Sequence, residues 1–168
     1  MQNLRTPVIA FAARSGSGKT TLIEKVIKQL KTDGYRIAAI KHDAHQFDID
    51  QPGKDTRKMA EAGADVVVIS SSDKLAIIEK VAREKNLDEL IAMLPHVDVI
   101  LVEGFKKSGK PTIEVFRSTV NHELLSELPC RLAIASDITW EIGVPCYHID
   151  DVDGVVSEIK KHIACKLI

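Results

Sequence analysis

Residues 12–22 read Ala-Ala-Arg-Ser-Gly-Ser-Gly-Lys-Thr-Thr-Leu, and this stretch decides the fold. An apolar run at 7–12 precedes it. In the run that follows, apolar side chains recur at helical spacing, namely Leu22, Ile23, Val26, Ile27 and Leu30. The sequence therefore predicts a strand, a tight glycine-containing loop and a helix.

The loop has the residues of a phosphate-binding loop. Its glycines allow backbone N–H groups to turn toward phosphate oxygens, and the helix adds the positive end of its dipole. We expect nucleotide contacts from Ser15, Gly16, Ser17, Gly18, Lys19, Thr20 and Thr21. Lys19 is predicted to reach the β- and γ-phosphates, and Thr20 to offer its hydroxyl to Mg²⁺. Ala13 stands where this motif usually has glycine, so we expect an ordinary backbone conformation there. The alternative, a solvated turn before a helix, is disfavoured by the strand and helix that flank the loop.

Length and composition narrow the class of protein. A chain of 168 residues suits one domain, and we predict a single domain over 1–168. A formal net charge of −1 gives no general attraction to nucleic acid or anionic lipid. Cys130, Cys146 and Cys165 are odd in number and lack metal-site spacing, which is typical of reduced thiols inside a cell. Because no apolar run approaches the roughly 18 residues of a membrane span, we expect a soluble cytoplasmic protein with no membrane or nucleic-acid partner.

The rest of the chain alternates strand and helix patterns. A strand at 35–40 that follows the first helix implies parallel pairing with the first strand. Further strands are predicted at 65–70, 97–105, 111–117, 131–137 and 144–149, and helices at 56–62, 86–94 and 151–163. The run 75–81 fits a strand or the start of a helix, and Pro111 indicates an edge or hairpin strand. The predicted fold class is α/β, a three-layer P-loop NTPase-like fold with a mostly parallel sheet flanked by helices.

The loop at 41–55 follows the second strand and carries two histidines and four aspartates. It lies at the carboxyl end of a strand, where open α/β sheets bind ligands. We expect a switch segment or a second site here, formed by His42, His45 and Asp55. The two histidines suit a transition metal ion, and the alternative is a solvated loop in which Asp55 caps the next helix.

A continuous apolar strand at 97–105 ends in Glu103-Gly104. This pattern is typical of a buried parallel strand that brings a carboxylate to the ligand edge of a sheet. Glu103 is predicted to hold Mg²⁺, directly or through water, or to orient a water molecule at the γ-phosphate. Asp98 lies at the other end of the strand and is interpreted as a turn residue. Three lysines follow, which are either solvated or meet an anionic ligand: Lys106, Lys107 and Lys110.

Asp137 ends the predicted strand at 131–137 on the same edge. A carboxylate there can accept hydrogen bonds from the N1–H and 2-amino groups of guanine. The common Asn-Lys-x-Asp guanine signature is absent, so a plain turn role is the alternative.

Three segments together resemble one family. They are the phosphate loop in its Ala-Arg-Ser-Gly-Ser-Gly-Lys-Thr form at 13–20, the loop at 40–55, and the Leu-Val-Glu-Gly-Phe-Lys segment at 101–106. The family is that of the molybdopterin-guanine dinucleotide biosynthesis adaptor protein B, and the resemblance runs from the first strand to the closing helix. Ala13, unusual in a general phosphate loop, matches this family's version of it.

The resemblance implies a GTP-binding, Mg²⁺-dependent, homodimeric P-loop protein with at most slow GTP hydrolysis. It further implies a role in assisting the guanylyltransferase that attaches GMP to molybdenum-bound molybdopterin. The family's phosphate-loop role falls on 16–21 and its acidic strand-end role on Glu103. Lys19 and Glu103 are then the catalytic residues of any hydrolysis. Without the resemblance, the sequence does not distinguish GTP from ATP. It also leaves open whether the loop at 41–55 holds a metal ion, molybdopterin or only water.

Two other functions use the same residues. A small-molecule kinase would move a phosphoryl group to a metabolite hydroxyl, with 106–117 as its candidate lid. A nucleotide-regulated structural module would bind without catalysis. Arg14 lies five residues before Lys19, and we hypothesise that it contacts phosphate in trans across a dimer. The alternative is a solvent-exposed Arg14.

Overall fold

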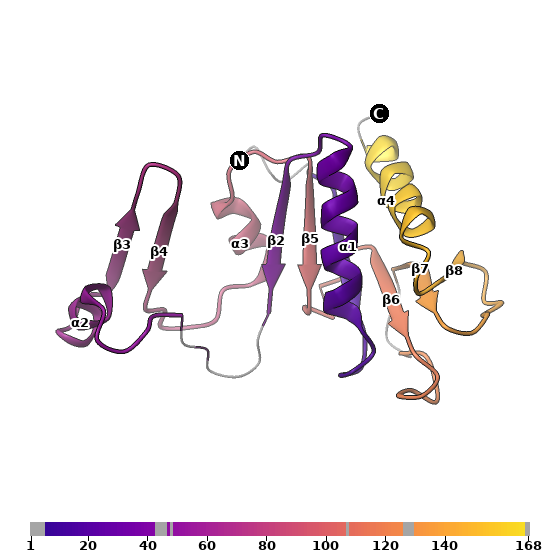
Figure 1. Ribbon diagram of the computed structural model, residues 1–168, viewed down its shortest axis with the longest axis horizontal. Coiled ribbons are helices and arrows are strands. Elements are labelled where there is room, and N and C mark those ends of the chain that lie inside the picture. The colour runs from indigo at the N-terminus through magenta and orange to yellow at the C-terminus, as the bar shows by residue number, and fades with distance from the viewer. Residues whose placement is uncertain (1–5, 43–46, 48, 107, 126–129, 167–168) are drawn as a thin grey trace. The chain divides into compact units, whose positions relative to one another are not determined.

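The first strand, the glycine loop and the first helix form where the sequence predicts them. The computed structural model describes residues 6–42, 47, 49–106, 108–125 and 130–166 (Figure 1). The strands are β1 (Val8–Ala12), β2 (Ile37–Lys41), β3 (Val66–Ser70), β4 (Leu75–Glu79), β5 (Val99–Glu103), β6 (Thr112–Phe116), β7 (Arg131–Ser136) and β8 (Cys146–His148). The helices are α1 (Lys19–Thr32), α2 (Asp55–Glu61), α3 (Leu87–Met93) and α4 (Val152–Lys166).

The chain divides into two compact units. Residues 1–42 and 87–168 form the first unit, and residues 43–86 form the second. The first unit contains a six-stranded sheet in the order β2-β5-β1-β6-β7-β8, whose neighbouring strands all pair in parallel. The second contains α2 and the two-stranded sheet of β3 and β4.

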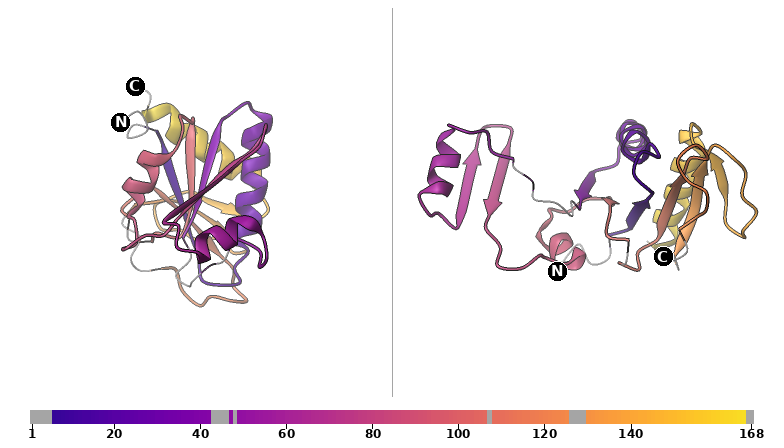
Figure 2. Two further views of the ribbon diagram at one scale, coloured as in Figure 1. Left: turned by 90° about the vertical axis from the view of Figure 1, so that its left-hand side faces the viewer. Right: turned by 90° about the horizontal axis from the view of Figure 1, so that it is seen from below.

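Helices cover both faces of the large sheet, which confirms the predicted three-layer fold. Side chains alternate across β1: Ile9 and Phe11 pack with α1 and α4, whereas Val8 and Ala10 pack with α3. Figure 2 shows α3 on the opposite side of the sheet from α1. The apolar face predicted for α1 is buried, with Leu22, Ile23, Val26 and Leu30 in the core. The central strands are therefore held from both sides.

The central position of β1 sets where the site lies. It pairs with β5 on one side and β6 on the other, and the register places Phe11 beside Glu103 and Ala12 beside Glu114. Because all six strands are parallel, their carboxyl ends meet at one edge of the sheet, where ligands bind in open α/β folds. At the opposite edge, the Asp98 carboxylate accepts a hydrogen bond from the Arg36 backbone N–H (2.6 Å), in keeping with its predicted turn role.

β6 is an interior strand, so the prediction that Pro111 places it at an edge or in a hairpin is wrong. It pairs in parallel with β1 and β7, and all its side chains are buried. Pro111 stands just before the strand, and its carbonyl accepts a hydrogen bond from the Ala10 N–H (2.8 Å). Because proline precedes the strand, its missing N–H removes no hydrogen bond between β6 and its neighbours.

The second unit resolves the run at 75–81 as a strand. β4 pairs antiparallel with β3, with Val68 opposite Ile77. Residues of one period-two face are all at least half exposed: Val66 50%, Val68 56%, Leu75 65% and Ile77 60%. On the other face Val67 is buried. Within the second unit, one face of the hairpin is thus apolar and uncovered.

Asp55 does not cap α2, contrary to the expectation from sequence. It is the first residue of the helix, and Lys54 occupies the N-cap position without a side-chain cap hydrogen bond. An acidic residue in the first turn still interacts favourably with the helix dipole.

Cys130, Cys146 and Cys165 are all free thiols. None of the helices in the described part of the chain has both the length and the apolar character that a bilayer crossing requires.

Candidate nucleotide site

The phosphate loop takes the shape that its glycines allow. Gly16 and Gly18 have φ of 81° and 85°, and Gly18 is the N-cap residue of α1. Among the described residues, Phe105 is the one non-glycine residue with positive φ, so Ala13 has the ordinary backbone predicted for it. The loop therefore enters from β1 without strain and turns at its two glycines into the helix.

A pocket of about 540 Å³ opens over this loop at the carboxyl edge of the sheet. Residues 13–21 line it, together with Phe11, His42, Glu103, Gly104 and Lys106. The start of α1 thus points its unpaired backbone N–H groups and its positive dipole end at this pocket. Such an arrangement favours an anionic ligand.

Glu103 joins the two side chains predicted to contact phosphate and Mg²⁺. Its Oε1 accepts a hydrogen bond from the Thr20 hydroxyl (3.2 Å) and forms an ion pair with the Lys19 ammonium. The side chains of Lys19 and Glu103 are only 19% and 17% exposed. One carboxylate, one ammonium and one hydroxyl therefore meet in a sheltered position beside the loop.

The chain beyond Glu103 turns sharply against His42. The His42 backbone N–H donates to the Glu103 carbonyl (2.8 Å), and the rings of His42 and Phe105 lie 4.6 Å apart. Gly104 has φ of 98°, and a Cβ placed on it would lie 2.8 Å from the His42 Cβ. Glycine is therefore required here by both its backbone conformation and the close approach of β2.

We expect Gly104→Ala to lower the free energy of unfolding by at least about 1 kcal/mol, because the new methyl group clashes with His42 and φ is unfavourable. Urea denaturation measures the change. Gly109→Ala is the matched control, since φ is also positive (68°) but no atom lies within 4 Å of the added Cβ. Equal losses in both variants would contradict a role for the clash.

A turn after β6, residues 117–121, packs against the phosphate loop, and sequence reasoning missed it. The Asn121 side-chain N–H donates to the Ser17 hydroxyl oxygen (3.0 Å), which itself donates to the Arg14 carbonyl (2.9 Å). Ser17 and Asn121 are both nearly fully buried. The Ser17 side chain therefore supports the loop, and the Ser17 backbone N–H also donates to the Arg14 carbonyl (3.4 Å). The predicted nucleotide contact of Ser17 stays a prediction. The signal available in the sequence for this turn was the mostly polar run at 117–121, which directly follows an apolar strand.

Asp137 lies at the end of β7 and holds the same turn. The Ser118 backbone N–H donates to Oδ1 and the Ser118 hydroxyl to Oδ2, each at 2.8 Å. The backbone hydrogen bond, aided by the hydroxyl, holds the pKa of Asp137 below its ordinary value. An ionised carboxylate accepts up to about four hydrogen bonds, so two more remain for the donors of guanine. The assignment of Asp137 to guanine stays a prediction.

The remaining predicted site residues divide between the lining of this pocket, the second unit and the part of the chain outside the described residues. Arg14 lines the pocket, and its half-exposed side chain pairs with Glu123 (3.3 Å). His42 lines the pocket, whereas His45 lies outside the described residues and Asp55 belongs to the second unit. Among the basic residues, Lys110 pairs with Asp88 (2.7 Å), and Lys107 lies outside the described residues. Within the described ranges, no group of three or more His, Cys, Asp or Glu residues could hold a metal ion.

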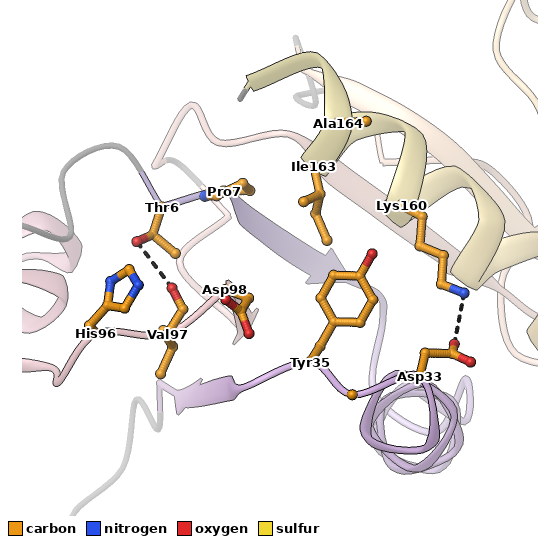
Figure 3. A pocket seen from close by; sticks show the side chains of 11 residues that line it. Thr6, Pro7, Asp33, Tyr35, His96, Val97, Asp98, Lys160, Ile163 and Ala164 are labelled. Atoms are coloured by element: carbon orange, nitrogen blue, oxygen red, sulfur yellow. Dashed lines mark hydrogen bonds and ion pairs between the residues drawn. The ribbon is translucent and has the colours of Figure 1, made fainter. Parts of the chain in front are cut away.

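A second pocket, also about 540 Å³, lies at the amino ends of β1 and β5 (Figure 3). Tyr35 and Ile163 form part of its apolar wall, and its charged groups include Asp33 and Lys160, which pair with each other at 2.8 Å. It contains no glycine loop that leads into a helix. Its paired charges therefore give no comparable attraction to a phosphate group.

Comparison with known families points to one group of proteins. The family model for molybdopterin guanine dinucleotide synthesis protein B matches residues 8–137. Over 158 residues the chain is 38% identical to the molybdopterin-guanine dinucleotide biosynthesis adapter protein of Escherichia coli (strain K12), which covers 90% of each chain. It is 34% identical over 160 residues to the protein of the same name in Haemophilus influenzae, covering 94% of this chain and 90% of that one.

Solved structures show the same relationship. A crystal structure of molybdopterin-guanine biosynthesis protein B (mobB) aligns with a TM-score of 0.73 at 30% identity, covering 92% of this chain and 98% of that one. The crystal structure of Bacillus subtilis MobB also has a TM-score of 0.73, at 28% identity, covering 90% of this chain and 97% of that one.

Proposed function

The chain belongs to the MobB family of molybdopterin guanine dinucleotide synthesis proteins, and from this premise we propose that it is a GTP-binding adaptor in that synthesis. The observation that carries GTP binding is the meeting of Lys19, Thr20 and Glu103 in the pocket over the phosphate loop. A triphosphate entering this pocket meets the positive end of α1 and the ammonium of Lys19.

The residues fit Mg²⁺ as a companion of the triphosphate. The Thr20 hydroxyl and the Glu103 carboxylate are oxygen donors that lie 3.2 Å apart, and Mg²⁺ prefers hard oxygen ligands supplied jointly by protein, water and phosphate. Thr20 and Glu103 would hold the ion, directly or through water, and the ion would neutralise charge on the phosphates. Lys19, released from its pair with Glu103 as the ion binds, would then face the phosphate oxygens.

The same residues support at most slow hydrolysis. Lys19 can stabilise charge on the transferred phosphoryl group, and Glu103 can orient a water molecule. The sheltered Lys19–Glu103 pair also suits a nucleotide-sensing adaptor, because a bound triphosphate would replace Glu103 as the charge partner of Lys19.

We assign the guanylyltransferase of the pathway as the partner, since the relatives are named adapter proteins of this synthesis. The three free thiols support a cytoplasmic setting.

The exposed hairpin face supports a homodimer. Val66, Val68, Leu75 and Ile77 form an apolar surface on a two-stranded sheet, and such a sheet is marginal in water unless it is covered. We assign a second copy of the chain as the covering partner, because homo-oligomers with self-complementary patches are the commonest soluble assemblies. Light scattering gives the mass in solution, and a monomer at micromolar concentration would contradict this assignment.

Calorimetric titration tests the proposed nucleotide. With Mg²⁺ we expect GTP to bind more tightly than ATP, and Glu103→Gln to lose most of the Mg²⁺ dependence while still binding GTP. Incubation with γ-labelled GTP should release phosphate slowly. Transfer of the label to an added metabolite would indicate a kinase, and a protein that binds neither nucleotide would contradict the proposal.

A further inference from the structure

The turn at 117–121 is anchored at both ends beside the phosphate loop. The Arg117 carbonyl accepts hydrogen bonds from the backbone N–H groups of Val120 (3.0 Å) and Asn121 (2.9 Å), which closes the turn. Asp137 holds Ser118 with two hydrogen bonds, and Asn121 holds Ser17 with one. The backbone of Arg117 therefore has little freedom, and its side chain starts from a fixed point.

The Arg117 side chain reaches the phosphate loop from the β6 side. A terminal guanidinium nitrogen would lie 3.5 Å from a Cβ placed on Gly18, the N-cap residue of α1. The positive end of a helix repels a cation that has no anion beside it. The dipole of α1 therefore disfavours a guanidinium at this position, and an anion bound at the loop would offset that repulsion.

Charge pairing distinguishes Arg117 from Arg14 and Lys19, the two cations of the phosphate-loop segment 12–22. Lys19 pairs with Glu103 and Arg14 with Glu123. For the Arg117 guanidinium, the residues that the structure describes provide no hydrogen-bond or ion-pair partner. Its charge nevertheless acts on Asp137, where it adds a small downward shift to the pKa that Ser118 already lowers. Arg117 therefore keeps its planar set of donors available for a ligand.

We propose that Arg117 is a nucleotide-contacting residue, whose guanidinium binds the phosphate chain beside Gly18 from the side opposite Glu103. This inference rests on the proposed GTP binding and adds a second wall to that site. The contact explains why the turn is fastened to the loop through Ser17 and Asn121, since a misplaced turn would move the guanidinium away from phosphate. Arg117 would form the paired N–H to oxygen hydrogen bonds that guanidinium makes with phosphate.

Arg117→Gln tests the contact, because glutamine keeps much of the stem and removes the charge. GTP affinity in the presence of Mg²⁺ should fall about 10- to 100-fold, as expected for loss of charged hydrogen bonds, and Arg117→Lys should recover part of it. Inorganic tripolyphosphate, tested by displacement of labelled GTP, should lose affinity to a similar degree. Arg36→Ala, which removes an exposed arginine at the opposite edge of the sheet, should bind like the wild type.

The outcomes separate this inference from the proposed function. If the wild type binds no GTP, the proposed function fails. If the wild type binds GTP and Arg117→Gln binds it within twofold, the phosphate contact is overturned. A loss restricted to GTP, with tripolyphosphate unchanged, would place Arg117 on the base or ribose and also overturn it. A variant that no longer unfolds cooperatively would show that Arg117 supports the turn, and this result would also overturn the phosphate contact.

Discussion

Lys19→Ala is expected to weaken GTP binding by about two orders of magnitude, because a charged hydrogen bond contributes roughly 1.5–3 kcal/mol and each 1.4 kcal/mol is tenfold in affinity. The loss has two causes. The ammonium no longer meets the phosphates, and the Glu103 carboxylate is left without its ion-pair partner in a sheltered position that faces the incoming charge. Calorimetric titration measures the affinity, and Lys28→Ala, an exposed lysine on the same helix, is the matched control.

The second cause can be measured separately with a double variant. Adding Glu103→Gln to Lys19→Ala removes the uncompensated carboxylate, so GTP affinity without Mg²⁺ should rise several-fold relative to Lys19→Ala alone. In the presence of Mg²⁺ this recovery should shrink, because the metal also neutralises Glu103. GTP binding to Lys19→Ala at wild-type affinity would mean that the loop does not hold the phosphates.

Glu114→Ala is expected to lower the free energy of unfolding by about 3–5 kcal/mol, the usual cost of breaking a buried ion pair. Glu114 lies within β6 and is 2% exposed. Its carboxylate accepts hydrogen bonds from the Arg131 Nε–H (2.8 Å) and from the Leu125 backbone N–H (2.7 Å). Removing it leaves the Arg131 guanidinium without its ion-pair partner, with only the Leu125 carbonyl (2.7 Å) as acceptor, and leaves the Leu125 N–H without its acceptor. Urea denaturation measures the loss.

Glu123→Ala provides the matched control for Glu114. It also deletes a glutamate paired with an arginine, but the pair is exposed (49% for Arg14 and 78% for Glu123) and its loss should cost less than about 1 kcal/mol. Similar losses in the two variants would show that burial does not decide the strength of the Glu114 pair.

The elements that local patterns define were predictable from the sequence. Leu22, Val26 and Leu30 are buried as the helical period requires, and Ala13 has the ordinary backbone that its residue type demands. The apolar run before Glu103 correctly predicted a buried parallel strand that ends at the ligand edge. In each of these cases, residues that are close in the sequence are sufficient to predict the local structure.

Features that depend on distant strands were not predictable. Pro111 suggested an edge strand, because the sequence does not reveal that β6 starts after the proline and lies between β1 and β7. Asn121 meets Ser17 only because β6 is adjacent to β1, and Ser118 meets Asp137 only because β7 is adjacent to β6. The packing of the 117–121 turn beside the phosphate loop therefore became visible only with the strand order.

The central place of β1 also has a consequence for how the protein is made. Its partners, β5 and β6, end at Glu103 and Phe116. About a hundred later residues must therefore be synthesised before β1 can pair with both strands. At about 5–20 residues per second, ribosomal synthesis keeps this apolar segment unpaired for on the order of ten seconds. The nascent chain is therefore expected to recruit chaperones during that interval, and to acquire nucleotide affinity only after β6 has left the exit tunnel.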